Sequence, residues 1–402
     1  MEGRRFNPWW TVGAGAVANA LGAGTIMVYA YGLMTVGMLA EFGWTLADAS
    51  RLFTAFLLGS GIGIAVLGWM ISRLGISLPS AVMAGIFGIA LAAVAALPPD
   101  HTWFWITFLF VGFGGAACTA MPYAVTISGL FDKHRGLALG IVVAGSAFTA
   151  PLLPQIAQEL TGTLGWRSNF IIFGLLSGTA SVIGLTFFVR TPTGATLKES
   201  EAAGHATRSA FQIYFGNRYF WLIAGSILAA SLAAFGGMSS LVGLFKSQNY
   251  DGRLIANIIS VAAIGSLAGK LCVGYLLDRY HAPFLSSAVF AIAATGFVLL
   301  LVTSAPIGAF VGAGFIAIAL GAEADILTYL ISRYFPLVEF SRVVGIIWVC
   351  WAWGGGIGTS IVAASLEADQ GYRAAFILFA VLLAAAAALV LLLGPYQNPR
   401  ES

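Results

Sequence analysis

The sequence has few charged residues. Its 402 residues include 16 aspartates and glutamates and 19 lysines and arginines, so charged side chains make up 9% of the chain. In water-soluble globular proteins, about a quarter of the residues are charged. This shortage excludes a soluble enzyme and a nucleic-acid-binding protein. The three cysteines and four histidines have no metal-ligand spacing and suggest no disulfide framework.

Long apolar runs make up most of the sequence. Hydrophobic residues account for 59% of the chain, and the mean hydropathy is +0.92. About 20 apolar residues cross the hydrocarbon core of a bilayer as a helix. We therefore expect an all-α polytopic membrane protein in contact with the lipid bilayer. Charged, proline and glycine residues separate the runs and predict twelve transmembrane helices, at residues 9–39, 46–71, 76–97, 102–130, 136–160, 168–190, 217–245, 253–277, 283–303, 307–332, 343–365 and 373–394.

The lysines and arginines are distributed unevenly over the predicted loops. Thirteen of the 19 lie on the side of the N-terminus and five on the other side, while Lys270 belongs to no loop. Cytoplasmic loops carry the excess of positive charge, so both termini are predicted to be cytoplasmic. The first apolar run is too long for a signal peptide and is expected to be retained as the first span. We expect a multi-pass protein of the cell inner (plasma) membrane.

The two halves of the sequence repeat each other. Gly68 and Arg73, after the second predicted helix, correspond to Gly274 and Arg279, after the eighth, and each correspondence spans 206 residues. Several matches at one offset indicate a duplicated unit. The longest polar stretch lies between the halves. These features predict two pseudo-symmetric six-helix bundles, residues 1–190 and 217–402, joined by a cytoplasmic linker, residues 191–216.

A short motif follows the eighth predicted helix. Residues Gly274–Arg279 fit the pattern G-x-x-x-D-R, and the corresponding segment of the first half has Ser72 in place of the acid. We expect Gly274 to permit the close approach of two helices, and Asp278 to pair with a basic group near the cytosolic face. Such a pair can lock one conformation. The predicted gating motif consists of Gly274, Asp278, Arg279, Gly68 and Arg73.

The motif, the twelve helices, the central linker and the half-chain repeat together resemble the major facilitator superfamily, over the whole chain. The resemblance implies the major facilitator fold and secondary transport. A narrower match follows the fourth predicted helix, where Phe131–Gly145 is similar to a signature of the monocarboxylate porter family. That family's acidic opening, D-G-G-W, is absent here. The first predicted helix also has no lysine, so an anion-binding lysine cannot be placed there.

Three charged residues lie well inside predicted spans, namely Lys270 in the eighth helix and Glu323 and Asp325 in the tenth. A charge at mid-membrane costs at least ~3 kcal/mol, so such a side chain normally faces a cavity or a partner. Lys270 and Asp325 each stand eight residues before a charged residue at the cytosolic end of their helix, a rise of about 12 Å. The two are predicted to lie at similar depth. Glu323 is expected about 3 Å further outward, on a different helical face.

Two interpretations of these charges remain open. In the functional one, Lys270 binds the carboxylate of a substrate and Asp325 or Glu323 carries a coupled proton, because an anion on the lysine leaves the acid free to bind a proton. In the structural one, the lysine and an acid form an ion pair that holds two helices together. The resemblance adds that Lys270 stands where related oxalate/formate exchangers have an arginine, and Trp351 where they have a second cation. A single cation suits a monovalent anion.

Aromatic side chains are candidates for shaping the substrate site. Tyrosine hydroxyls can bond a second carboxylate oxygen, and aromatic rings favour an apolar or aromatic acid. Besides Lys270, the predicted substrate-binding residues are Tyr29, Tyr31, Tyr123, Tyr329, Trp351 and Trp353. Such residues also occur in lipid belts and packing seams, an alternative that stays open for each. The glycine-rich segments 59–63 and 354–358 are predicted to be places of close helix packing or hinge points, not nucleotide-binding loops.

The sequence therefore predicts a secondary active transporter that moves a monocarboxylate together with a proton by alternating access. A carboxylate/carboxylate exchanger of the same fold is the alternative. A non-transporting receptor, from another class, would normally carry a long tail or an extra domain. An enzyme is not expected, because one lysine and two acids supply no nucleophile with its base. We expect a monomer with no metal, no cofactor other than the coupling proton, and no nucleic-acid partner.

Overall fold

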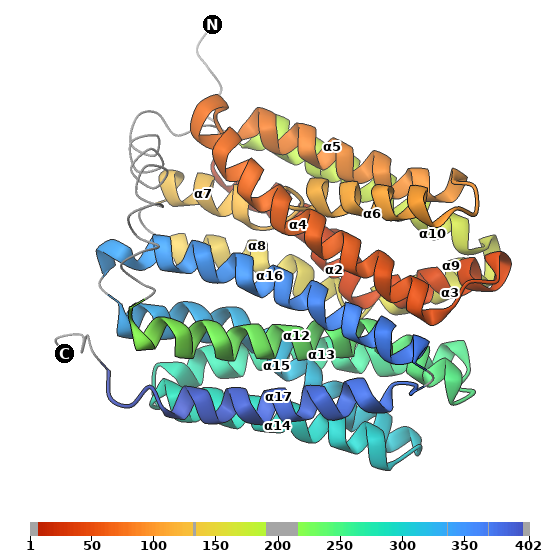
Figure 1. The fold of residues 1–402 in the computed structure, drawn as a ribbon. Helices are drawn as coiled ribbons and strands as arrows, with labels where there is room; N and C mark the ends of the chain where they lie inside the picture. Colours follow the sequence, from red (N-terminus) through yellow and green to blue (C-terminus); the bar gives the residue numbers. More distant parts are fainter. Residues whose placement is uncertain (1–6, 132–133, 190–215, 336, 369, 397–402) are drawn as a thin grey trace, which may run out of the picture. The chain divides into compact units, whose positions relative to one another are not determined.

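A computed structural model describes residues 7–131, 134–189, 216–335, 337–368 and 370–396, and Figure 1 shows its course. All regular structure in these ranges is helical, and no strand occurs in them. This confirms the predicted all-α class. The predicted linker, residues 191–216, lies almost entirely outside the described residues.

Most helices of the first half of the chain are shorter than those of the second. The first half contains α1 (Trp9–Ala20), α2 (Ala23–Tyr29), α3 (Tyr31–Phe42), α4 (Leu46–Leu74), α5 (Ser77–Ala93), η1 (Val94–Ala96), α6 (His101–Gly115), α7 (Met121–Leu130), α8 (Arg135–Thr149), α9 (Leu153–Leu164), α10 (Trp166–Ile183) and η2 (Gly184–Phe188). The second half contains α12 (Arg218–Ser247), α13 (Gly252–Leu277), α14 (Ala282–Val302), α15 (Pro306–Tyr334), α16 (Leu337–Glu367) and α17 (Arg373–Leu391).

Three predicted spans of the first half are broken helices. Residues 9–39 form α1, α2 and most of α3, residues 102–130 form α6 and α7, and residues 136–160 form α8 and most of α9. Among the described residues, ten helical segments are long and apolar enough to cross a membrane, and α8 with α9, bent by 41°, makes an eleventh. With 15 and 10 residues, α6 and α7 are each too short to span alone.

Proline explains the break between α6 and α7. Pro122 has no N–H, and its ring clashes with the carbonyl four residues earlier, so a regular helix does not run through it. That carbonyl, of Cys118, instead accepts a hydrogen bond from the N–H of Ala23 at 3.2 Å. Gly22 leaves the space for this contact, because a Cβ there would stand 2.8 Å from the same oxygen. The break before α2 and the break before α7 thus satisfy each other's backbone groups.

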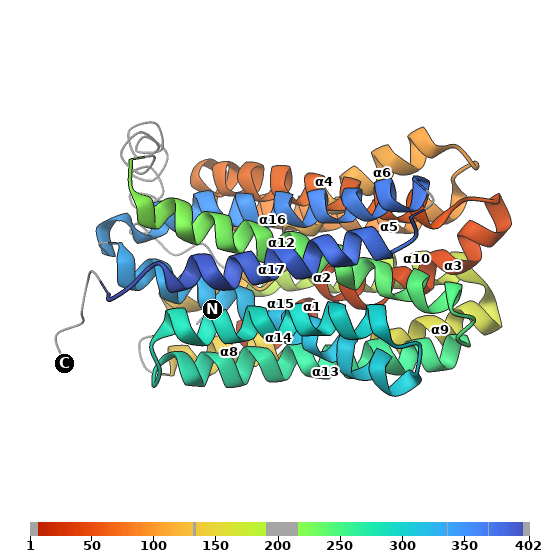
Figure 2. The ribbon, with the colours of Figure 1, turned by 60° about the horizontal axis from the view of Figure 1, so that its bottom comes forward.

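Contacts within the chain define two compact units. Unit 1 comprises residues 1–30 and 58–202, and unit 2 comprises residues 31–57 and 203–402. Helix α3 and the start of α4 therefore belong with the C-terminal helices, where α3 contacts α12. Within unit 2, α12 packs against α16 and α17, and α15 packs against α13 and α14 (Figure 2). The division into bundles at 1–190 and 217–402 stays a prediction.

Glycines permit the closest helix contacts in unit 1. A Cβ atom at Gly59 or Gly63 of α4 would overlap the backbone of α6 at Leu109 or Phe113. In unit 2, a Cβ atom at Gly358 of α16 would overlap the backbone of α12 at Leu232, and one at Gly354 or Gly355 would overlap side chains of α12. Both glycine-rich segments therefore pack helices, as predicted.

The corresponding contact in unit 2 joins α13 and α15. Gly265 and Gly269, which follow the two glycines of α4 by 206 residues, face the backbone of α15. A Cβ at Gly269 would overlap the carbonyl oxygen of Ile318, and one at Gly321 would overlap that of Ser266. The repeat in the sequence is thus also a repeat in helix packing.

We predict that Gly269→Ala destabilises the protein, because the added methyl group must displace the backbone of α15. Overpacking of this kind costs about 1–3 kcal/mol and should lower the apparent Tm of the purified protein in detergent. Gly314→Ala on α15 is the matched control, since a Cβ there would meet no atom within 4 Å. Its Tm should be unchanged or higher, because alanine favours helix more than glycine does. Equal Tm values for the two variants would contradict the close contact.

Candidate functional site

Lys270 and Asp325 lie where α13 meets α15. Lys270 is half-buried and precedes Gly274 by one helical turn. The carboxylate of Asp325, also half-buried, has its Oδ2 3.9 Å from the place where a Cβ of Gly274 would stand. The charge of Lys270 acts on this carboxylate. The placement agrees with the similar depth predicted for the two charges.

Lys270 and Asp325 are near each other without forming a direct ion pair. Neither side chain makes an ion pair within 4.0 Å with any residue that the structure describes. The glycine contacts, not a salt bridge, bring the two helices together. Among the described residues, no carboxylate therefore lies in direct contact with the ammonium group of Lys270.

Glu323 points to a different helix. Its side chain is fully buried, and its Oε2 accepts a hydrogen bond of 2.8 Å from Nε1–H of Trp351 in α16. The other oxygen, Oε1, is buried and has no hydrogen-bond partner among the described residues. Residues two apart on a helix point about 200° apart, so Glu323 and Asp325 meet different neighbours.

Two further rings hold Trp351 in place. The ring centres of Phe235 in α12 and Trp348 in α16 each lie 4.9 Å from that of Trp351, in edge-to-face geometry. Trp353, two residues further along α16, is 47% exposed. The sequence marks Trp351 as a candidate, but its bond to Glu323 depends on how α15 and α16 are rotated, which no local pattern indicates.

The predicted tyrosines lie in different surroundings. The hydroxyl of Tyr329 accepts a hydrogen bond of 2.9 Å from an arginine one turn further along α15, and that of Tyr31 donates one of 2.6 Å to the carbonyl of Ala49. Tyr123 is buried in unit 1, where its hydroxyl has no hydrogen-bond partner among the described residues. Tyr29 ends α2 and is half-buried. A substrate-binding role for these side chains stays a prediction.

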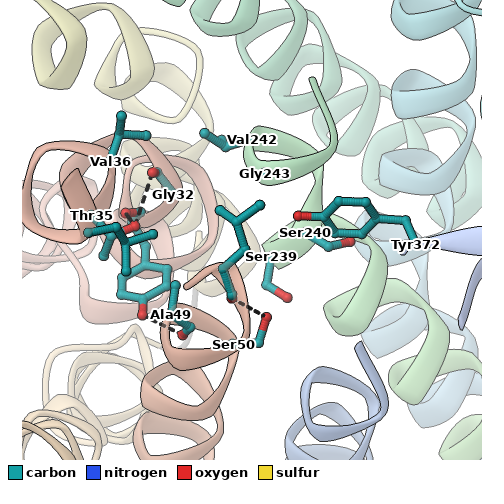
Figure 3. A pocket seen from close by; sticks show the side chains of 13 residues that line it. Gly32, Thr35, Val36, Ala49, Ser50, Ser239, Ser240, Val242, Gly243 and Tyr372 are labelled. Atoms are coloured by element: carbon teal, nitrogen blue, oxygen red, sulfur yellow. Dashed lines mark hydrogen bonds between the residues drawn. The ribbon is translucent and has the colours of Figure 1, made fainter. Parts of the chain in front are cut away.

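Unit 2 also contains a narrow pocket between α3, the start of α4, the end of α12 and Tyr372 (Figure 3). It has room for about one or two water molecules. Burial raises the pKa of the Tyr372 hydroxyl, which therefore stays neutral. No charge and no motif marks this pocket in the sequence, because its lining comes from separate segments. The hydroxyl groups around it belong to Tyr31, Thr35, Ser50, Ser239, Ser240 and Tyr372.

Polar contacts fasten the start of α4 to α16. Arg51 forms ion pairs with Asp48 on its own helix, at 3.3 Å, and with Glu367 at the end of α16. One turn along, the hydroxyl of Thr54 lies 2.7 Å from that of Thr359. The Arg51 side chain is 50% exposed, and ion pairs at exposed sites contribute about 0–1 kcal/mol. The ion pairs of this α4–α16 contact, which is formed at Arg51 and Thr54, therefore contribute little.

The two arginines of the predicted gating motif stack on aromatic rings. The guanidinium of Arg279 lies 4.3 Å from the ring centre of Tyr275, and that of Arg73 lies 4.6 Å from the ring centre of Trp69. The two stacks are 206 residues apart, and both rings are exposed. Asp278 is exposed at the end of α13 and makes no ion pair within 4.0 Å with any described residue. The lock expected at Asp278 stays a prediction.

The glycines of this motif do not make the close helix contact expected of Gly274. A Cβ atom at Gly274 would make an ordinary contact of 3.9 Å, and one at Gly68 would meet nothing within 4 Å. The expectation is wrong because the close approach of α13 occurs earlier in the helix, at Gly265 and Gly269. Gly274 instead leaves space beside the carboxylate of Asp325.

The described residues offer no cluster of metal ligands. No three histidine, cysteine, aspartate or glutamate side chains lie close enough together there to hold a metal ion. Cys118, Cys272 and Cys350 are free thiols.

The known proteins that are similar to this chain include membrane transporters. A family model described as Major Facilitator Superfamily matches residues 12–359 and 253–402 of the chain. Human monocarboxylate transporter 11 is 26% identical over 294 residues, which cover 68% of this chain and 59% of that protein. The match thus spans about three fifths of the length of that relative. YhjX, an uncharacterized MFS-type transporter of Escherichia coli, is 22% identical over 368 residues, covering 87% of this chain and 85% of that protein.

A solved structure shares the fold. The crystal structure of a D-xylose–proton symporter superposes with a TM-score of 0.73, covering 95% of this chain and 97% of that chain, at 15% sequence identity. A likeness at this identity shows the fold alone. It confirms the predicted fold class.

Proposed function

The chain belongs to the major facilitator superfamily of secondary transporters, and on this premise we propose that it carries a monocarboxylate together with a proton. The observation that carries the proposal is Lys270, a half-buried cation inside α13 that has no direct ion pair among the described residues. A charge inside a membrane span is costly to keep and usually serves a ligand or ion pathway. The same proposal includes an inner-membrane location with both termini in the cytoplasm.

A carboxylate anion is the ligand that complements Lys270. The other lysines and arginines of unit 2 whose side chains the structure describes lie near the ends of helices. Among these described residues of unit 2, Lys270 is therefore the one positive charge at this depth. A monocarboxylate adds one negative charge beside Lys270, whereas a dicarboxylate adds two in surroundings of low dielectric constant. The arrangement supports a monocarboxylate over a dicarboxylate.

The two acids of α15 link the anion to a proton. Without substrate, Asp325 is the acid of α15 that lies within the electrostatic influence of Lys270. A bound carboxylate adds negative charge near both acids, and a negative neighbour favours the protonated form of a carboxyl group. Anion and proton then each favour the binding of the other, which is the thermodynamic requirement for moving them together.

Alternating access requires contacts that break and form again in every cycle. The α4–α16 contact suits this task, because an exposed ion pair and hydroxyl hydrogen bonds each contribute little free energy. On the predicted topology, this contact lies on the outer side of the membrane. Its opening would admit substrate from that side.

The first test is the uptake of radiolabelled lactate, pyruvate and benzoate into proteoliposomes under an imposed pH gradient. We expect accumulation when the interior is the more alkaline side. Lys270→Ala should reduce this uptake at least about tenfold, because the anion loses its counter-charge inside the membrane. Lys270→Arg, which keeps the charge, should retain part of it.

Lys246→Ala is the matched control, since Lys246 is exposed at the end of α12, and its uptake should equal that of the wild type. Full uptake by Lys270→Ala would contradict anion binding at Lys270. Labelled carboxylate that enters without a pH gradient, and only against carboxylate trapped inside, would identify an exchanger instead.

The second test concerns the α4–α16 contact. Arg51→Cys with Glu367→Cys, in a background without the three native cysteines, places a thiol on each side of it. Cross-linking the pair with a short bifunctional reagent should abolish uptake, because the start of α4 can no longer leave α16, and reduction should restore it. In the control, Asp48→Cys with Arg51→Cys, both thiols lie on α4, so cross-linking should leave uptake intact. Uptake that continues in the cross-linked Arg51–Glu367 variant would refute the opening of this contact.

A further inference from the structure

The two acids of α15 have different neighbours. Asp325 is directed at α13, beside Gly274 and within the influence of Lys270. Glu323 is directed at α16, where the indole N–H of Trp351 is bonded to it at 2.8 Å. Asp325 is half-buried, whereas Glu323 is fully buried. Two carboxyl groups two residues apart thus stand in unlike surroundings.

The surroundings of Glu323 suit a neutral acid. An ionised carboxylate removed from water needs a cation or several donors. Glu323 has one donor, the uncharged indole of Trp351, and its Oε1 has no hydrogen-bond partner among the described residues. A neutral carboxylic acid keeps the bond to Trp351 on one oxygen and carries its proton on the other.

The helices packed against α15 bring few ionisable groups to this region. Away from helix ends, and within the described residues, they are Lys270 and Cys272 on α13 and Cys350 on α16, while α12 and α14 carry none there. Cys272 is exposed on α13. The electrostatic interaction of Lys270 is with Asp325 on α15. The protonation of Glu323 is therefore governed by its burial, by Trp351 and by the charge balance at Lys270 and Asp325.

We infer that Glu323 is the residue that carries the transported proton and that Trp351 is its positioning residue, whereas Asp325 serves as the counter-charge of Lys270. The inference rests on the proposed symport. The proton binds to a Glu323 oxygen from water on one side and leaves to water on the other. Each turnover then moves one carboxylate anion and one proton. Phe235 and Trp348 hold the indole at the angle that keeps its N–H on Oε2.

The experiment compares two assays on the reconstituted full chain, using whichever of lactate, pyruvate or benzoate the wild type accumulates. One assay is uptake driven by a pH gradient, and the other is counterflow of labelled against unlabelled carboxylate without a gradient. Glu323→Gln keeps the shape of a protonated glutamate but cannot release a proton. It should lose gradient-driven accumulation by at least about tenfold and keep counterflow.

Asp325→Asn is the matched variant on the same helix. It removes the negative charge that competes with substrate for Lys270, so the carboxylate concentration at half-maximal rate should fall in both assays. The response to the pH gradient should remain. A reversed result, in which Asp325→Asn loses the response and Glu323→Gln keeps it, would overturn the assignment.

The Trp351→Phe variant tests the positioning role. Its result does not depend on whether Glu323→Gln folds. An N–H donor stabilises the ionised form of a carboxyl group, so without it the protonated form persists to higher pH. The pH of half-maximal uptake should rise by roughly one unit, which is the tenfold change expected for one hydrogen bond. Trp221→Phe, at an exposed position on α12, should leave that pH unchanged. An unshifted profile for Trp351→Phe would refute the positioning role.

Failure of proton symport and failure of the Glu323 assignment give different results. A wild type that does not respond to a pH gradient would refute proton symport, and this assignment with it. A wild type that responds, together with a Glu323→Gln variant that also responds, would leave symport standing and refute Glu323 as the proton carrier.

Discussion

The contact of glycine backbones between α13 and α15 is the constraint on which the site depends. Side chains at Gly269 or Gly321 would overlap the facing helix, so the helices could not approach as they do. Lys270 directly follows the first of these glycines, and Asp325 lies one turn after the second. Because backbone contacts hold the helices together, the two charges are not needed as a clamp. Small residues that pack helices in lipid therefore do here what an ion pair would otherwise have to do.

Glu323 and Asp325 both lie on α15, and they point in different directions around the helix axis. Two ionised carboxylates at this spacing would repel each other in a medium of low dielectric constant. Their different neighbours resolve this conflict, since a cation acts on Asp325 and an indole N–H is bonded to Glu323. Adjacent titrating groups with unlike surroundings can perform different tasks. The proposed transport chemistry uses this difference.

The all-α class and the buried charges could be predicted from the sequence because both leave local signals. A lysine within an apolar run is conspicuous, and the eight-residue spacings placed Lys270 and Asp325 at similar depth. The bond between Glu323 and Trp351 could not be predicted, because it joins residues 28 apart in sequence and depends on how their two helices are rotated. Hydropathy also merges α6 with α7, since Pro122 interrupts the helix without making the run less apolar. The pocket near Tyr372 left no signal, because its lining is uncharged and comes from distant segments.

The broken helices of the first half distinguish two sequence repeats that otherwise correspond. The breaks between α1 and α2, α6 and α7, and α8 and α9 interrupt the ladders of backbone hydrogen bonds, whereas α12 to α17 run without interruption. A helix bends most easily where its ladder is interrupted. The three breaks lie in the half whose described spans lack the lysine and the two acids. The charged groups of the other half stand on helices whose ladders continue on both sides of them, so their mutual geometry does not depend on a hinge within either helix.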